Sequence, residues 1–219
     1  VAPLGGFLEG LRTACDQVGA LLIYDEVITG FRLAQGGAVE QFGITPDLWC
    51  FGKVIGGGLP VGAFGGRWEV MENLAPLGGV YQGGTLSGNP LAMAAGRTTL
   101  ELLDDGAFDR LAATATRLAE GLTDAFTSAG LSAVMPRVGS LLGLYFGERA
   151  PTDFDEAKVL ADNGVYPKVF HALLERGVAL APGAYEAVFP SLAHDETVIE
   201  ETIEIASEAA FAVSGLTTS

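Results

Sequence analysis

One apolar run constrains the fold of this chain more than any other feature. The run Leu21–Tyr24 is followed directly by the carboxylates Asp25 and Glu26. A short, continuous apolar run of this kind is typical of a parallel strand that is buried on both faces. Because open α/β sheets bind their ligands beyond the carboxyl ends of their strands, we expect Asp25 to lie at a ligand site. The run therefore predicts an α/β protein with a parallel sheet.

A lone lysine and a glycine-rich segment follow this strand. Lys53 stands between a short apolar segment and three glycines, and the next lysine is Lys158. The segment Gly83–Pro90 combines glycines, hydroxyls and a proline that suits the first turn of a helix. Such a segment is typical of an anion-binding helix start. Two roles stay open for Thr85 within it, a phosphate ligand or an ordinary helix cap.

A carboxylate, a lysine and a phosphate cradle are the protein partners that pyridoxal phosphate requires. Asp25 would hold the proton on the pyridine nitrogen, and Val27 would pack on the ring face. Lys53 would bond to the cofactor and carry protons at the substrate carbon. A nucleotide-binding P-loop is excluded, because that motif needs glycine at position 47 and Ser or Thr at position 54, where the chain has Asp47 and Val54. We expect no metal ion in this site.

Four segments spread over the chain carry a resemblance to a known family. They are Gly19–Arg32, Thr45–Leu48, Gly52–Ala63 and Tyr81–Ala92. In these segments the chain resembles the fold-type I, class III aminotransferases, which depend on pyridoxal phosphate. The phrase Gly-Gly-Thr-Leu-Ser-Gly-Asn-Pro and the segment Ser191–His194 resemble the glutamate-1-semialdehyde aminomutases of that family more narrowly.

The resemblance implies a reaction and an assembly. An amino group would move within one small molecule, converting glutamate 1-semialdehyde to 5-aminolevulinate for tetrapyrrole (porphyrin) synthesis, with the pyridoxamine form of the cofactor taking part. Gly84 and Thr85 would bind the phosphate, and in a homodimer Thr85 would reach the other subunit's cofactor. Glu186 matches an acidic residue near the aminomutase active site, although Val188 replaces the glycine of the family's Phe-Glu-Ala-Gly-Phe.

Two alternatives to this reaction stay open. One is a class III aminotransferase that acts on an ω-amino acid and a 2-oxo acid, since it would use the same Asp25, Lys53 and Thr85. The other is a folded fragment that is inactive by itself. By comparison with the family, about half of a complete enzyme would be missing in front of Val1, including the glycine-rich phosphate loop and the residues that contact the substrate carboxylate.

Composition argues against several kinds of partner. A formal net charge of -15 repels nucleic acid and anionic membranes over a Debye length. The longest apolar runs fall far short of the roughly 20 residues that a membrane helix needs. Cys15 and Cys50 lack the spacing of a metal or redox motif, so they are interpreted as reduced thiols of a cytoplasmic protein.

Helical periodicity and glycine placement predict two domains, and the resemblance implies that they follow the fold-type I pattern. Residues 1–104 would form the C-terminal part of the large α/β domain that binds the cofactor, and residues 105–219 a small C-terminal α+β domain. The expected longer helices are Gly6–Val18, Pro90–Leu103, Ala107–Ala129, Tyr166–Arg176 and Glu196–Val213. The expected strands are Ala20–Tyr24, Leu48–Phe51, Val61–Gly65, Ser132–Pro136, Leu141–Phe146 and Val178–Ala181.

Overall fold

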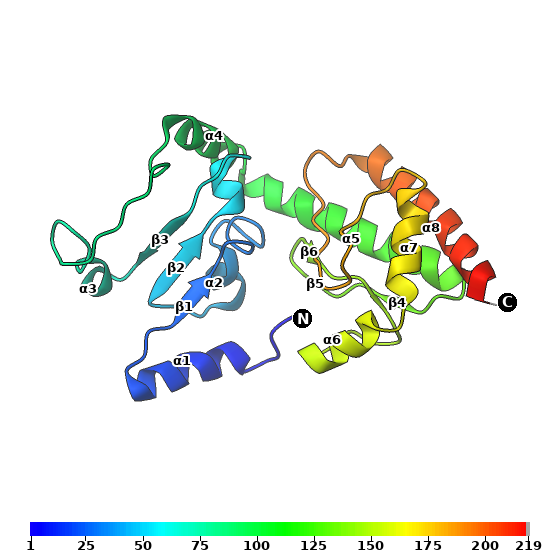
Figure 1. Ribbon diagram of the computed structural model, residues 1–219, viewed down its shortest axis with the longest axis horizontal. Coiled ribbons are helices and arrows are strands. Elements are labelled where there is room, and N and C mark those ends of the chain that lie inside the picture. The colour runs from blue at the N-terminus through cyan, green and yellow to red at the C-terminus, as the bar shows by residue number, and fades with distance from the viewer. Residues whose placement is uncertain (218–219) are drawn as a thin grey trace. The chain divides into compact units, whose positions relative to one another are not determined.

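The computed structural model describes residues 1–217, and the chain forms two compact units (Figure 1). The sheet unit comprises Gly5–Phe108, and the helical unit comprises Val1–Leu4 with the chain from Asp109 onward. That a boundary after residue 104 separates a large from a small domain of the family stays a prediction.

A three-stranded sheet, in the order β1-β2-β3, forms the centre of the sheet unit. Strands β1 (Ile23–Asp25) and β2 (Leu48–Phe51) are parallel, and β3 (Ala63–Gly66) runs antiparallel to β2 (Figure 1). Because β1 and β2 are parallel, their carboxyl ends lie at the same edge of the sheet. The helical elements of this unit are α1 (Phe7–Val18), α2 (Gly37–Phe42), the 3-10 helix η1 (Lys53–Gly56), α3 (Trp68–Met71) and α4 (Pro90–Glu101).

Asp47 ties the elements together at the opposite edge of the sheet. Its buried carboxylate accepts hydrogen bonds from the Leu22 N–H at 2.7 Å and from Arg12 Nη1 at 2.8 Å, and it pairs with Arg67 Nη2 at 3.0 Å. The Leu22 N–H and then the Arg12 guanidinium lower the pKa of the Asp47 carboxyl.

The expectation that β1 is buried on both faces is wrong. Tyr24 is only 9% exposed, but Ile23 on the opposite face is 54% exposed, and α1 has no buried residue at all. Parallel strands are buried when layers of helix cover both faces of the sheet. The described residues of this unit cover one face of β1 and leave the other open.

The helical unit has a closed apolar core. Its helices are α5 (Asp105–Ser128), α6 (Phe154–Ala161), α7 (Val165–Leu174) and α8 (Glu196–Thr217) (Figure 1). They enclose the fully buried side chains of Phe126, Leu142, Leu173 and Val213 in one cluster. The rings of Phe126 and Phe146 meet edge to face, with their centroids 5.2 Å apart. None of the helices in residues 1–217 is long and apolar enough to span a membrane.

The helical unit also contains short strands, and the sequence predicted these strands less accurately than the helices. The strands β4 (Ala133–Val134) and β7 (Tyr145–Phe146) pair, as do β5 (Arg137–Val138) and β6 (Leu141–Leu142). The single strand expected over 141–146 is therefore two strands, since Gly143 instead donates its N–H to the Pro136 carbonyl. The strand expected over 178–181 does not form, and Val188, outside the expected strands, pairs with Leu142 of β6.

Candidate active site

Strands β1 and β2 lie side by side and parallel (Figure 1), and Asp25 ends the first while Lys53 follows the second. Asp25 is the last residue of β1 and lies opposite Cys50 of β2, and the ladder continues with a 2.8 Å bond from the Glu26 N–H to the Cys50 carbonyl. Lys53 comes three residues after Cys50. Both side chains are exposed, so a carboxylate and an amine are accessible at the same edge.

Val27 lies between these two groups in the structure. The Val27 N–H donates to Asp25 Oδ1 at 3.0 Å, which orients the carboxylate. The Val27 side chain also packs on the buried backbone of Gly52, where an added Cβ atom would lie 3.3 Å from Val27 Cγ1. The three expected cofactor residues of this edge, Asp25, Val27 and Lys53, are thus brought together by β1 and β2.

The backbone of Lys53 has a left-handed conformation, with φ at 49°. In residues 1–217 the only other non-glycine residue with positive φ is Phe31, whose ring contacts that of Phe51 in β2. A side chain makes this conformation costly, by about 1–2 kcal/mol. Strain of this kind persists only where the surrounding structure imposes it, and it is concentrated at functional sites.

Gly84 and Thr85 lie in an exposed loop that leads into α4. The Ser87 N–H closes a turn on the Gly84 carbonyl at 2.9 Å. Asn89 caps the helix, because its side chain accepts from Leu91 N at 3.0 Å and from Ala92 N. The alternative that Thr85 is the helix cap is therefore wrong, and its hydroxyl is left for another partner.

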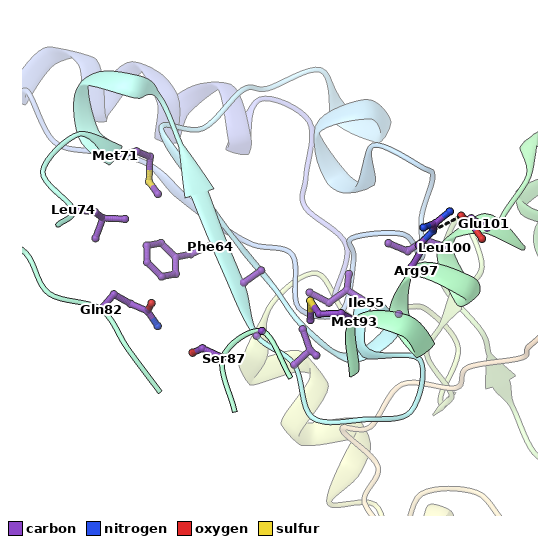
Figure 2. Close-up of a pocket in the computed structure, with 15 residues that line it drawn as sticks. Ile55, Phe64, Met71, Leu74, Gln82, Ser87, Met93, Arg97, Leu100 and Glu101 are labelled. Atoms are coloured by element: carbon purple, nitrogen blue, oxygen red, sulfur yellow. Dashed lines mark hydrogen bonds and ion pairs between the residues drawn. The ribbon is translucent and has the colours of Figure 1, made fainter. Parts of the chain in front are cut away.

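A hollow of about 850 Å³ lies on another part of the sheet unit (Figure 2). Figure 2 shows Met71, Leu74 and Gln82 around the ring of Phe64, and the 2.7 Å ion pair of Arg97 with Glu101 at the other end. None of the residues expected to bind the cofactor lines this hollow. Its open, mostly apolar lining is typical of a surface that another polypeptide covers rather than of a phosphate site.

Glu186 lies in the helical unit, in a hollow of about 120 Å³ that Arg137, Tyr145 and Tyr185 also line. Burial raises the pKa of the Tyr145 hydroxyl, and Tyr185 adds to the effect. Val188, which stands where the family has glycine, exchanges two backbone hydrogen bonds with Leu142 and so fixes this segment beside β6. A common site for Glu186 and Lys53 stays a prediction, since they belong to different units.

Glu26, next to Asp25, caps a helix, a particular role that the sequence did not reveal. Its side chain is 1% exposed and accepts from the Ala38 N–H at 2.8 Å and from the Val39 N–H, so it caps the start of α2. Gly37, with φ at 63°, leaves room for the carboxylate, because a Cβ atom there would lie 2.6 Å from Glu26 Oε2. The one signal in the sequence was the glycine pair at positions 36 and 37.

Among the residues that the structure describes, no group of three or more His, Cys, Asp or Glu side chains is placed to hold a metal ion. The donor set at the strand edge is instead one carboxylate and one amine, which matches the needs of a pyridine ring with an aldehyde rather than those of a metal. The geometry therefore fits the organic cofactor expected from the sequence.

The model of the aminotransferase class-III family matches residues 1–209. The chain belongs to this family. A glutamate-1-semialdehyde 2,1-aminomutase of Natranaerobius thermophilus is 51% identical over 210 residues, which is 95% of this chain and 49% of that protein. This class III aminotransferase chain thus spans about half the length of the curated relative that it matches.

Solved structures agree with the class III assignment. An omega-transaminase from Sphaerobacter thermophilus superposes with a TM-score of 0.87 at 34% identity, over 96% of this chain and 48% of that one. A transaminase with PLP bound superposes with a TM-score of 0.85 at 27% identity, over all of this chain and 50% of that one. The expected fold class, that of the fold-type I PLP-dependent transferases, is confirmed.

Proposed function

We propose that the full-length protein converts glutamate 1-semialdehyde to 5-aminolevulinate, a step of tetrapyrrole synthesis, in the cytoplasm. The observation that carries the proposal is the placement of Asp25 and Lys53 at the carboxyl ends of the parallel strands β1 and β2, in a chain that is 51% identical to an aminomutase. The substrate is a small amino aldehyde, and neither nucleic acid nor a membrane takes part, since the chain carries a net charge of -15.

Pyridoxal phosphate, with its pyridoxamine form, is the proposed cofactor. When bound, it supplies an electron sink that stabilises negative charge at the substrate carbon. Asp25 would hold the proton on the ring nitrogen, and Val27 would pack on the ring. Backbone N–H groups near Gly84 and the hydroxyl of Thr85 would bind the phosphate, because a loop before a helix N-terminus attracts anions.

Lys53 is proposed to do two things with its amine. The amine would bond to the cofactor aldehyde until substrate displaces it. The free Nζ would then take a proton from the substrate carbon and return it to another atom. The amine is exposed at the strand edge, so it is accessible for both steps. Glu186 would supply a carboxylate near the substrate, a role carried over from the family.

Two chains are proposed to share each active site, with Thr85 serving the other subunit's cofactor. Residues 73–96 contain no charged residue, in a chain with 27 acidic ones. In this stretch Tyr81, Leu86 and Leu91 have exposed side chains. An uncharged surface with exposed aromatic and aliphatic groups is typical of a subunit interface, and it supports a homodimer formed around this stretch.

The second candidate function is transfer of an amino group from an ω-amino acid to a 2-oxo acid. The similarity to an omega-transaminase at 34% identity favours it, and in this chain the reaction would use the same Asp25, Lys53 and Thr85. The two functions differ in their need for an amino acceptor. We expect product from glutamate 1-semialdehyde without any 2-oxo acid, and an absolute requirement for a 2-oxo acid would establish the transaminase instead.

Residues 1–219 by themselves are proposed to be inactive. The chain spans 49% of the related aminomutase, and the open face of β1 leaves the strand edge accessible to water. After addition of pyridoxal phosphate to the 219-residue chain, we expect little of the visible absorbance that a lysine-bound cofactor gives. A strong and stable band would show that Asp25, Lys53 and their neighbours form a complete site.

A further inference from the structure

The turn that follows Lys53 lies directly against helix α4, backbone to backbone. A Cβ atom at Gly96 of α4 would lie 2.0 Å from the carbonyl oxygen of Ile55 in η1. On the other side of the contact, a Cβ atom at Gly57 would lie 2.5 Å from the carbonyl oxygen of Ala95. Real Cβ atoms do not approach this closely, so only glycine fits at either position.

Helix formation alone does not explain Gly96. Glycine in a helix interior is less stable than alanine, because it loses more backbone freedom on folding. Gly10 in α1 shows the contrast, since a Cβ atom there would meet nothing within 4 Å. The close approach to Ile55 therefore requires glycine at position 96, whereas no contact requires it at position 10.

Lys53 stands between this backbone contact and a looser one at Gly52, where an added Cβ atom would lie 3.3 Å from Val27 Cγ1. On its amino side, Gly52 is buried against Val27, and on its carboxyl side η1 lies against α4 at Gly96. Between them the Lys53 backbone is held at a φ of 49°. A strained residue keeps its conformation only when its neighbours over-determine it, so releasing one contact allows Lys53 to relax and its amine to move.

We propose that Gly96 is a positioning residue, which acts through the Ile55 carbonyl to hold Lys53 in the conformation that presents its amine to the cofactor aldehyde. The proposal rests on the proposed function of Lys53. Gly96 itself touches neither cofactor nor substrate. Its effect should therefore appear in the reaction of the Lys53 amine and not in noncovalent binding of the cofactor.

The test measures the reactivity of Lys53 against a reference lysine of the same molecule. The full-length protein is treated with pyridoxal phosphate and borohydride between pH 7 and pH 9, and peptide mapping gives the ratio of label on Lys53 to label on Lys168. Lys168 is exposed on α7 of the other unit. The affinity for pyridoxamine phosphate, which has no aldehyde to bond to lysine, is measured in parallel.

In Gly96→Ala we expect the labelling ratio to fall by about tenfold or more, while the affinity for pyridoxamine phosphate changes by less than about twofold. Gly10→Ala, the matched exchange in a helix interior, should change none of these readouts. A ratio in Gly96→Ala within twofold of the parent overturns the proposal, as does a parallel loss of pyridoxamine phosphate binding.

A milder variant covers the case in which Gly96→Ala does not fold. The Thr99 hydroxyl packs at the same contact, because a Cβ atom added at Gly57 would lie 2.7 Å from it. Thr99→Ala removes atoms without a clash, and we expect about a two- to threefold lower labelling ratio with unchanged pyridoxamine phosphate affinity. An unchanged ratio contradicts the proposal.

The proposed function can fail separately. If the label in the parent protein goes to Lys158 or Lys168 and not to Lys53, the role of Lys53 is wrong and the positioning role falls with it. If the parent is labelled on Lys53 and both variants keep the full ratio, only the role of Gly96 is wrong.

Discussion

The helical unit closes a single apolar core, whereas the sheet unit leaves much of its apolar surface open. Phe126 is fully buried among residues of α5, α7 and α8. In the sheet unit, Phe7 of α1 is 55% exposed, and Ile23 of the active-site strand is similarly open. The unit that carries Asp25 and Lys53 is thus the one with less core of its own.

This difference shows that the two units are stabilised by different kinds of contact. The helical unit relies on burial of large side chains, which is the dominant favourable term in folding. In the sheet unit, polar contacts contribute more to stability. Asp47 bonds to Arg12, Leu22 and Arg67, and Glu26 caps α2. The open apolar faces of the sheet unit are consistent with further polypeptide covering them in the full-length protein.

Replacing Lys53 should separate catalysis from stability most sharply. In the full-length protein, Lys53→Ala should lower turnover by at least about 10²–10⁴-fold, because the group that moves the proton is lost. Its side chain is exposed, so the free energy of unfolding should change by less than about 0.5 kcal/mol. Lys168→Ala is the control, and turnover assays with urea unfolding are the measurement. Near-normal turnover of Lys53→Ala would contradict the assignment.

Two phenylalanines test the comparison of the cores directly. In the 219-residue chain, Phe126→Ala should lower the free energy of unfolding by about 3–5 kcal/mol, because it leaves a cavity in a closed core. Phe7→Ala should change it by less than about 0.5 kcal/mol, since the ring is largely in water. Urea denaturation measures both. Equal losses would show that the sheet unit buries Phe7 after all.

Thr85→Ala should weaken cofactor binding without dissociating the dimer. The loss of one charge-assisted hydrogen bond costs about 1.5–3 kcal/mol, or roughly ten- to a hundredfold in affinity for pyridoxal phosphate. Equilibrium dialysis gives the affinity and light scattering the mass. Ser87→Ala, a hydroxyl in the same loop, is the matched control, and equal losses in both variants would argue against a specific role for Thr85.

Mixing variants decides which subunit Thr85 serves. In a dimer of one Lys53→Ala chain and one Thr85→Ala chain, one site collects both changes and the other neither, so activity should reappear. If the heterodimer forms and no activity returns, Thr85 acts on its own chain's site or on none.

The smallest expected effect is a pH dependence in the helical unit. Hydrogen bonds from Arg149 and then from the Thr152 N–H lower the pKa of Glu156 from 4.5 to about 2. Because the folded-state pKa is depressed, this contribution to stability is present above the unfolded value and is lost as the pH falls from 4.5 towards 2. We expect the urea midpoint of Glu156→Gln to depend less on pH between 4.5 and about 2 than that of the parent. Glu204→Gln, which replaces an exposed carboxylate of a helix, should keep the pH dependence of the parent.

Local signals predicted much of the fold. Gly19 ends α1, and Pro90 opens α4, as their sequence context indicated. The meeting of Asp25 and Lys53 also followed from the sequence, since a parallel pairing of two successive apolar runs brings their ends to one edge. These features depend on residues close together in the chain or on a general rule of sheet geometry.

The rest depends on contacts between distant residues. Glu26 caps a helix twelve residues away, and Val188 pairs with Leu142 of β6, which is distant in the sequence. The turn after Lys53 lies directly against Gly96, which belongs to a different helix. No periodicity or turn preference encodes such pairings, so the sequence by itself does not predict them.

β1 is an outermost strand of the sheet, and this affects how the protein behaves when it is concentrated. The described chain pairs β1 only with β2, and the segment 19–24 contains no lysine, arginine or proline. Edge strands without such residues readily accept a strand from another molecule. The net charge of -15 keeps molecules apart at low ionic strength, and salt screens that repulsion. The 219-residue chain should therefore remain dispersed in dilute buffer and self-associate through the active-site strand when it is concentrated in high salt.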